Sequence, residues 1–253
     1  MRLMLVLLTI VAAPAWCAES VWLYDLNQHR AELDQHSEQV RSIASITKIM
    51  TAMVALDHDP DLNRRLTLSR RVGSYLPPRS YTRAELFDVM LVKSDNAAAE
   101  TLAEDYPGGR RAFVEAMNHR AGSLHLEHTR FQDASGLGSG NVSTAREIGQ
   151  LVQAGARYLV IRQAAGKQQV AIETQQGRRS RTLELLHTNR GLMPEFDRII
   201  VGKTGLTSAA GWCVAMLVQQ ANQEWVIVVL GSQTRQARQH RVQQLVSSYM
   251  PNH

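Results

Sequence analysis

The sequence predicts an α/β domain of the α+β kind: an antiparallel sheet flanked by helices, with an additional all-helical part. Two observations favour this class. Apolar strand-like segments occur near both ends of the chain, at 21–26 and at 199–205, 212–218 and 225–230. Between them, apolar residues recur mainly at helical spacing. The 253 residues contain no linker, repeat or low-complexity tract, and they suffice for one large domain or two small ones.

The N-terminus has the features of a secretory signal. Arg2 is followed by the apolar run 3–13 and by small residues up to Ala18. The run is too short to span a bilayer comfortably, although an uncleaved anchor is the alternative. We therefore expect residues 1–18 to be removed, and 19–253 to form a single catalytic domain exported to the periplasm. Cys213 then remains as the one thiol, within an apolar strand, so no disulfide supports the domain.

The first strand, 21–26, is followed by a turn and a short return strand to about Leu33. A helix from Ser45 to about Asp57 comes next, because its apolar residues form one broad face. Residues three apart share a helix face, so the Ser45 hydroxyl and the Lys48 amine should project together at its N-terminal end. A nucleophile beside a base suits covalent catalysis, but a Ser cap with a Lys in the first turn is commonly structural.

The segment 58–81 contains three prolines and predicts a loop with short strands. Thr82 and Glu85 have the spacing of a capping box, which predicts that a helix starts there. Ser94-Asp95-Asn96 separates this helix from the next. Ser94 and Asn96 can face a cleft from the inter-helix turn, or Ser or Asp simply caps the second helix.

The second half of the chain begins with a Gly/Ser-rich loop at 133–141 and a helix capped by Ser143 or Thr144. A strand pair is predicted at 169–174 and 180–186 around Gly177.

The last segments are an apolar strand that ends in Lys203-Thr204-Gly205, two further strands and a helix over about 234–249. Gly205 allows a ligand backbone to approach closely. The ammonium of Lys203 and the hydroxyl of Thr204 suit a carboxylate. The alternative is a strand end with an exposed lysine.

The chain carries a small net positive charge and uses arginine far more often than lysine. The net charge of +5 is modest, and the Arg pairs are scattered without interleaved aromatic residues, which argues against nucleic acid as a partner. Lysine can lose its proton when it is desolvated, whereas arginine cannot. The chain has only four lysines, which are Lys48, Lys93, Lys167 and Lys203. Three of the four, all except Lys167, lie in or beside the motifs above.

Ser-x-x-Lys, Ser-Asp-Asn and Lys-Thr-Gly, in this order, are far more specific than any one of them. With this trio the chain resembles a serine-type D-Ala-D-Ala peptidase, a low-molecular-weight penicillin-binding protein, over roughly 21–249. Three further stretches are most similar to the endopeptidases of this family: 106–109, 142–146 and 203–211.

The resemblance implies a role for each matched residue. Ser45 is the acylated nucleophile, Lys48 is its base in the neutral form, and Ser94 passes the proton to the leaving amine. Asn96 orients Lys48 and the substrate. The implied penicillin-binding-protein/β-lactamase-like fold places Ser94 in the all-helical part.

The substrate carboxylate is implied to bind Lys203 and Thr204 beside Gly205. The backbone N–H groups of Ser45 and Leu206 would form the oxyanion hole. Arg238 resembles a carboxylate-binding arginine of related carboxypeptidases, with Arg235 as an alternative.

The implied function is endopeptidase cleavage of D-Ala cross-links, with peptidoglycan peptide stems as substrate and β-lactams as covalent inhibitors. No cofactor or metal is required, and at most loose membrane association is expected. The sequence ends at His253, without the β-rich domain and amphipathic anchor of related carboxypeptidases, which favours an endopeptidase over a D-Ala-D-Ala carboxypeptidase. A β-lactamase is disfavoured because no Glu-x-x-Leu-Asn loop lies between Ser94 and Lys203. The alternative outside the enzymes is a non-catalytic peptidoglycan-binding protein.

Overall fold

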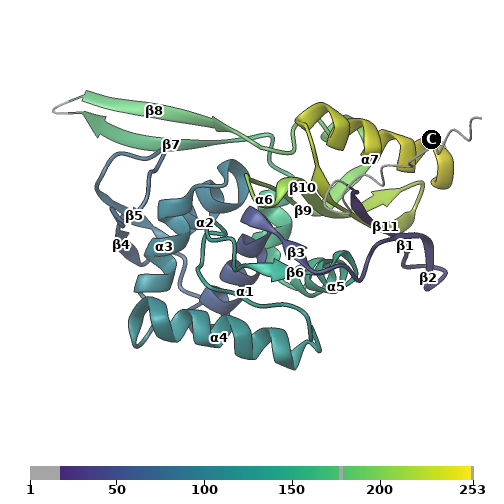
Figure 1. Ribbon diagram of the computed structural model, residues 1–253. Helices are drawn as coiled ribbons and strands as arrows, with labels where there is room; N and C mark the ends of the chain where they lie inside the picture. The colour runs from purple at the N-terminus through teal and green to yellow at the C-terminus, as the bar shows by residue number, and fades with distance from the viewer. Residues whose placement is uncertain (1–17, 177–178, 252–253) are drawn as a thin grey trace, which may run out of the picture.

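A five-stranded antiparallel sheet forms one half of the molecule in the computed structural model, which describes residues 18–176 and 179–251 (Figure 1). The strand order is β2-β1-β11-β10-β9. The bounds are β1 Ser20–Asp25, β2 Arg30–Gln35, β9 Arg198–Thr207, β10 Gly211–Gln220 and β11 Gln223–Ser232. The first strand therefore pairs with the last, and the predicted antiparallel sheet is confirmed. The predicted signal segment lies outside the described residues, apart from Ala18.

Both faces of the sheet are buried, because the middle of each central strand is a continuous apolar run, Cys213–Val218 in β10 and Trp225–Leu230 in β11. In β11, Val226, Val228 and Leu230 face one core, while Ile227 and Val229 face the other. Helix α5 (Ala145–Gly155) packs on the first face, and α7 (Arg235–Tyr249) packs on the second. Figure 1 shows α7 above the sheet and α5 below it. The prediction of a sheet flanked by helices is therefore correct, and the helices lie on both of its faces.

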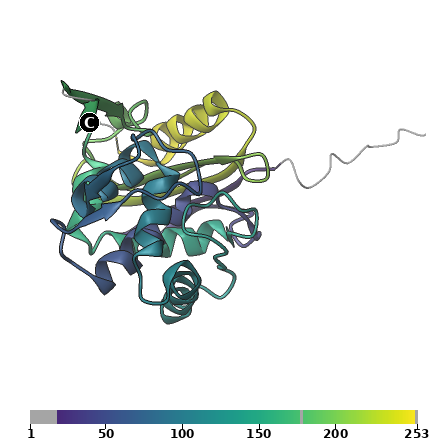
Figure 2. The same ribbon diagram turned by 90° about the vertical axis from the view of Figure 1, so that its left-hand side faces the viewer.

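The all-helical part surrounds α1 (Lys48–His58) (Figure 2). Its other members are α2 (Arg83–Asp88), the π-helical turn η3 (Val89–Lys93), α3 (Asn96–Glu104) and α4 (Gly109–Ser123). The prediction of a single buried face on the first helix is wrong, because every side chain from Lys48 to Ala55 is buried. Helices α3, α4 and α5 all contact α1 and enclose it.

Local capping signals placed the starts of α2, α5 and α7 well. The predicted capping box is present, with the Thr82 side chain accepting from the Glu85 N–H and the Glu85 carboxylate accepting from the Thr82 N–H. Thr144 caps α5 and Thr234 caps α7. Helix α6 (Leu159–Ala165), which packs on β9, was not predicted. A seven-residue apolar segment gives too little periodicity to identify a helix.

Three small two-stranded sheets complete the fold. They pair β3 (Arg41–Ser42) with β6 (Val142–Ser143), and β4 (Arg65–Thr67) with β5 (Ser80–Thr82). The third is the predicted strand pair, a long ribbon of β7 (Gln169–Gln176) and β8 (Arg179–Leu186) that extends beside the helical part (Figure 1). A 3₁₀ turn, η4 (Met193–Glu195), precedes β9. No helix of the described chain has the length and hydropathy that a membrane span requires.

Candidate active site

The predicted pair of Ser45 and Lys48 meets at the start of α1. Ser45 lies in a 3₁₀ turn, η2 (Ala44–Thr47), and Lys48 is the first residue of the α-helix, so the predicted helix start is one turn too early. The Nζ of Lys48 is 2.9 Å from the Oγ of Ser45. Ser45 is partly exposed, whereas Lys48 is fully buried. The hydroxyl is therefore open to a ligand, while the amine behind it is shielded from water.

Two further groups hold the Lys48 amine in place. Its Nζ donates to the Oδ1 of Asn96 at 2.7 Å and to the backbone carbonyl of Ser135. Burial lowers the pKa of Lys48 to about 7, although the carboxylates of Asp133 and Asp95 act in the opposite direction. An amine with this pKa is substantially neutral near neutral pH and can accept the hydroxyl proton.

The lowered pKa of Lys48 gives a pH dependence with a definite sign. Protonated Lys48 cannot take a proton from Ser45, so the acylation rate constant for a fluorescent penicillin should rise with pH and level off above the pKa of about 7. The measurement is the second-order rate constant between about pH 5.5 and 9, with fold monitored by circular dichroism. A rate that is constant or that falls across this range would contradict the role of Lys48 as the base.

Ser94 faces the site from the turn between η3 and α3, as predicted. Its backbone is left-handed, with φ of 69°, which ends η3. The next residue, Asp95, caps α3 by accepting from the Ala98 N–H at 2.9 Å. The capping interpretation therefore holds for Asp95, and the Ser94 side chain has no capping role. The Nζ of Lys203 donates to the Ser94 Oγ at 2.8 Å, so the site contains a second serine–lysine pair.

Lys203 is a buried amine on β9, at the edge of the sheet. Its Nζ also donates to the Thr204 carbonyl at 2.9 Å, and no carboxylate of the described residues forms an ion pair with it. Burial lowers the pKa of Lys203 well below its ordinary value, and the positive charges of Lys48 and Arg238 lower it further. A ligand carboxylate would supply the missing counter-charge. The alternative of an exposed strand-end lysine is wrong.

Two glycines pack closely against the peptide group that precedes Ser45. A Cβ on Gly205 would lie 3.0 Å from the carbonyl of Ile43 and 3.1 Å from the Ser45 N. A Cβ on Gly136 would lie 2.0 Å from the carbonyl of Ala44, whose φ is itself positive at 47°. This close packing fixes the direction of the Ser45 N–H, which the sequence assigned to an oxyanion hole.

Replacing Gly136 with alanine should damage the site, because its φ of +80° is unfavourable for alanine and the added Cβ would collide with backbone. We expect the free energy of unfolding to fall by more than about 1 kcal/mol. Penicillin acylation should fall as well, because the Ser45 turn must move. Urea denaturation and gel labelling measure the two effects. The control is Gly122→Ala, where a Cβ meets nothing within 4 Å; equal effects in both variants would contradict the argument.

The loop 133–141 organises the site, although the sequence marked it only as Gly/Ser-rich. The Asp133 Oδ1 accepts from the N–H groups of Ser135 and Gly136, and its Oδ2 accepts from that of Gly138. Asn141 donates to the Asp133 carbonyl at 3.0 Å. This folding of the loop presents the Ser135 carbonyl to Lys48. An Asp that opens a Gly/Ser-rich turn is a local signal for such a loop, but its packing on α1 has none.

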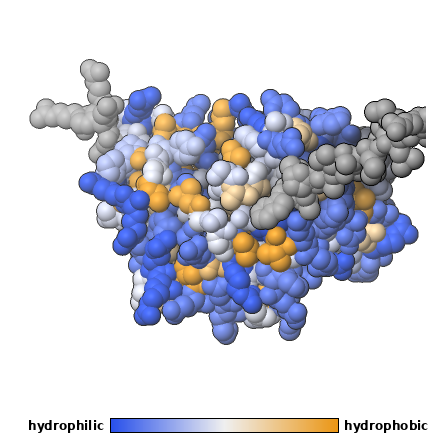
Figure 3. Space-filling view, viewed as in Figure 1, coloured by the Kyte–Doolittle hydropathy of each residue, from blue (hydrophilic) through white to orange (hydrophobic). Residues whose placement is uncertain are grey.

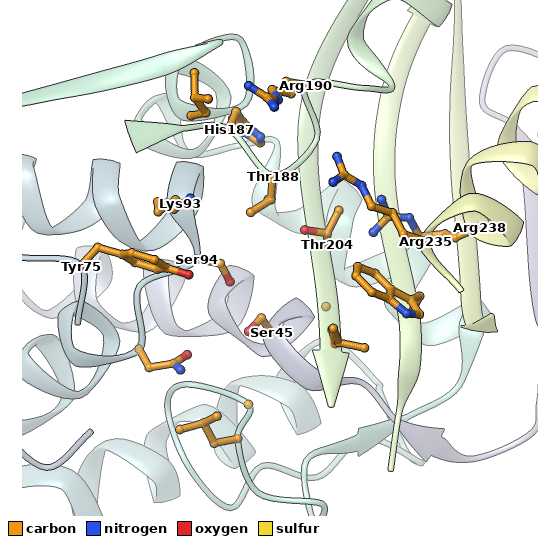
Figure 4. A pocket seen from close by; sticks show the side chains of 17 residues that line it. Ser45, Tyr75, Lys93, Ser94, His187, Thr188, Arg190, Thr204, Arg235 and Arg238 are labelled. Carbon is orange, nitrogen blue, oxygen red and sulfur yellow. The ribbon is translucent and has the colours of Figure 1, made fainter. Parts of the chain in front are cut away.

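The predicted residues surround a cavity of about 440 Å³ (Figure 4). Lys48 and Lys203 lie behind its wall and contact the two serines from there. The other seven predicted residues line it: Ser45, Ser94, Asn96, Thr204, Gly205, Leu206 and Arg238. The tertiary structure therefore brings all three motifs to one place.

Arg238 and Arg235 both line this cavity, so the two alternatives for the carboxylate-binding arginine share one site. Arg238 is 2% exposed, and its guanidinium carbon lies 5.7 Å from the centre of the Trp212 ring. One of its nitrogens donates to the Cys213 carbonyl at 3.4 Å, and its Nε has no partner among the described residues. Burial lowers the pKa of Arg238 to about 10, with a further contribution from Arg235.

Sequence reasoning missed most of the remaining wall. Tyr75 is held in place by Asp95, whose Oδ2 accepts from the Tyr75 N–H at 2.7 Å, and Lys93 lies 4.7 Å from the centre of the tyrosine ring. Together with Leu137, Leu186 and Leu206, Tyr75 gives the cavity exposed apolar surface. Figure 3 shows a mainly hydrophilic face on which hydrophobic residues are scattered. The other lining residues that were missed are Gly136, His187, Thr188, Arg190 and Trp212.

An antiparallel sheet with helices on both faces, and a serine hydrogen-bonded to a lysine between the sheet and an all-helical part, defines a serine peptidase of the penicillin-binding-protein class. The chain belongs to the peptidase S11 family, described as D-alanyl-D-alanine carboxypeptidase, whose profile matches residues 8–234.

Named relatives support this assignment. The chain is 35% identical over 231 residues to a D-alanyl-D-alanine endopeptidase of Escherichia coli, covering 88% of this chain and 74% of that protein. It is 34% identical over 210 residues to a D-alanyl-D-alanine endopeptidase of Pseudomonas aeruginosa, covering 78% of this chain and 66% of that protein. The fold also matches penicillin-binding protein D2 of Listeria monocytogenes in its cefotaxime-bound form, with a TM-score of 0.78, 25% identity and coverage of 90% and 95%.

Proposed function

We propose that this serine peptidase hydrolyses D-alanyl peptide cross-links of peptidoglycan through an acyl-enzyme on Ser45. The observation that carries the proposal is the pair of serine–lysine contacts, Ser45 with Lys48 and Ser94 with Lys203, on one cavity. The relatives named D-alanyl-D-alanine endopeptidase support the choice of bond. A non-catalytic binding protein would not require two paired hydroxyls and amines.

Acylation follows from this arrangement. Neutral Lys48 takes the proton of the Ser45 hydroxyl while Oγ attacks the D-alanyl carbonyl carbon. The N–H groups of Ser45 and Leu206 stabilise the oxyanion, and loss of one such donor typically costs about a hundredfold in rate. The C–N bond then breaks, and the Ser94 hydroxyl delivers its proton to the leaving amine. The proton that Lys48 took from Ser45 replaces it on Ser94, so Lys48 is neutral again before deacylation. Lys203 holds the Ser94 hydroxyl in place.

The carboxylate next to the scissile bond positions the substrate. The hydroxyl of Thr204 donates to it, and Lys203 and Arg238 supply charge that no carboxylate of the described chain neutralises. After the amine leaves, Lys48 accepts a proton from a water molecule that attacks the acyl carbon, and Ser45 regains its proton. Hydrolysis therefore releases two peptides and restores the free enzyme.

A β-lactam would acylate Ser45 in the same way, because its strained amide presents a carbonyl beside a carboxylate. Among the described residues that line the cavity, none is Asp or Glu. This composition offers no carboxylate base for rapid deacylation, which favours a stable adduct over β-lactamase turnover.

The test is to incubate the purified chain with a cross-linked muropeptide dimer and, separately, with a pentapeptide that ends in D-Ala-D-Ala. Mass spectrometry should show two monomers from the dimer, at a rate above that of D-alanine release. Faster release of D-alanine would instead favour carboxypeptidase activity, which the family description suggests. No cleavage of either substrate would reject hydrolysis.

We also propose that the chain acts in the periplasm after removal of its first 18 residues. The support is the apolar N-terminal run in the sequence, together with a substrate that lies outside the inner membrane. N-terminal sequencing of the protein recovered from a periplasmic fraction tests this proposal.

A further inference from the structure

The cavity carries more positive charge than one substrate carboxylate requires. Four of its lining residues are cationic: Lys93, Arg190, Arg235 and Arg238. No acidic residue lines it within the described part of the chain. Arg190 and Arg235 are exposed, and neither forms an ion pair within the described chain. Other exposed arginines, such as Arg65 and Arg70, also form no ion pair within the described chain, so the missing partner alone is not informative. Arg190 and Arg235 differ from them because both line one cavity, where a ligand anion could meet them together.

Arg190 and Arg235 lie at the same end of the cavity. Arg190 belongs to the loop that follows β8, and Arg235 is the first residue of α7. The loop and the helix are in contact there, because a Cβ on Gly191 would lie 3.9 Å from the Arg235 guanidinium. Figure 4 shows Arg190, Arg235 and Arg238 beyond Thr188 and Thr204 as seen from Ser45. This end is where the leaving half of the substrate lies if Thr204 and Arg238 hold its carboxylate.

A buried donor on the same wall also lacks a partner. His187 lines the cavity and is 2% exposed. Its Nδ1 accepts from the Asn189 N–H at 2.8 Å, so the ring hydrogen is on Nε2, and Nε2 has no partner among the described residues. Buried polar groups are normally satisfied. An unpaired N–H beside an unpaired arginine indicates a ligand oxygen.

We propose that Arg190, Arg235 and the Nε2–H of His187 form a second anion site, which binds a carboxylate of the leaving peptide other than the one next to the scissile bond. The inference rests on the proposed endopeptidase function. A terminal D-alanine carries one carboxylate, whereas a cross-linked peptide strand carries more. The second site therefore selects peptides whose leaving half has at least two carboxylates, and it separates cross-link cleavage from removal of a terminal D-alanine.

Two synthetic cross-linked peptides test the site. Both keep the carboxylate next to the scissile bond, and in one of them the second carboxylate of the leaving half is an amide. We expect the native enzyme to prefer the dicarboxylate by about tenfold in kcat/KM, mainly through KM, as is typical of one charge-assisted contact. In the double variant Arg190→Gln/Arg235→Gln this ratio should fall to about one. A general structural defect would lower both rates and leave the ratio unchanged.

The matched control is Arg111→Gln, which removes an exposed arginine on α4, away from the cavity, and should keep the native ratio. A native ratio of one, or a ratio that survives the double substitution, would overturn the second anion site. If the native enzyme cleaves neither peptide, the endopeptidase proposal fails. The anion site is then tested by how well each peptide protects the native chain from labelling by a fluorescent penicillin. The dicarboxylate should then slow fluorescent-penicillin labelling of the native chain at lower concentration than the amide, and equal protection would overturn the site.

Discussion

Replacing Ser45 with alanine should abolish covalent labelling by a fluorescent penicillin and hydrolysis of the muropeptide dimer. The substitution removes the only atom that forms the acyl bond and leaves the amine of Lys48 without its partner at 2.9 Å. The fold should persist, because the Ser45 side chain is partly exposed and the turn is held by its neighbours. The measurement is a denaturing gel, followed by mass spectrometry of the labelled peptide from the native chain.

The control for this experiment is Ser123→Ala, an exposed serine at the end of α4. It should keep full labelling. An adduct that survives in the Ser45 variant would show that another residue is acylated, and the mechanism proposed for this site would then be wrong.

Replacing Lys48 with arginine should be almost as severe as the loss of Ser45. Arginine retains a positive charge and cannot be deprotonated at any accessible pH, so it cannot accept the serine proton. Loss of a general base typically costs between about a hundredfold and ten-thousandfold, and we expect about a thousandfold here. The larger guanidinium must also fit a fully buried space beside Asn96 and the Ser135 carbonyl.

The matched substitution is Lys167→Arg, at a half-exposed lysine that forms an ion pair with Asp88. An arginine can keep this pair, and acylation should stay within about twofold of the native rate, as for other surface changes. The acylation rate constant of each purified variant is the measurement. A Lys48→Arg enzyme with more than about a tenth of the native rate would mean that another group accepts the proton.

Local sequence was sufficient for most of the fold. The apolar runs of the strands and the Thr82–Glu85 capping box both act within a few residues, and each predicted element lies near its predicted position. Short-range patterns fail where packing decides. Helix α6 has too few residues to show a period, and Ser45 lies in the 3₁₀ turn η2, where Gly136 and Gly205 pack on the backbone, instead of in the predicted α-helix.

The three motifs identified the reactive side chains, because a hydroxyl, an amine and an amide are recognisable as residue types wherever they lie. The sequence could not specify the environment of those groups. Lys48 has a pKa of about 7 because α1 is enclosed on all sides, and its amine meets Asn96 and Ser135, which are 48 and 87 residues away in the chain.

The sequence by itself therefore determined the kind of chemistry, since residue type and short spacing are local properties. Only the tertiary structure decided how the Lys48 amine is buried, which loop carbonyl holds it, and where Arg190, Arg235 and His187 meet. Desolvation and the convergence of charges depend on contacts between segments far apart in the chain, and no local pattern encodes those contacts.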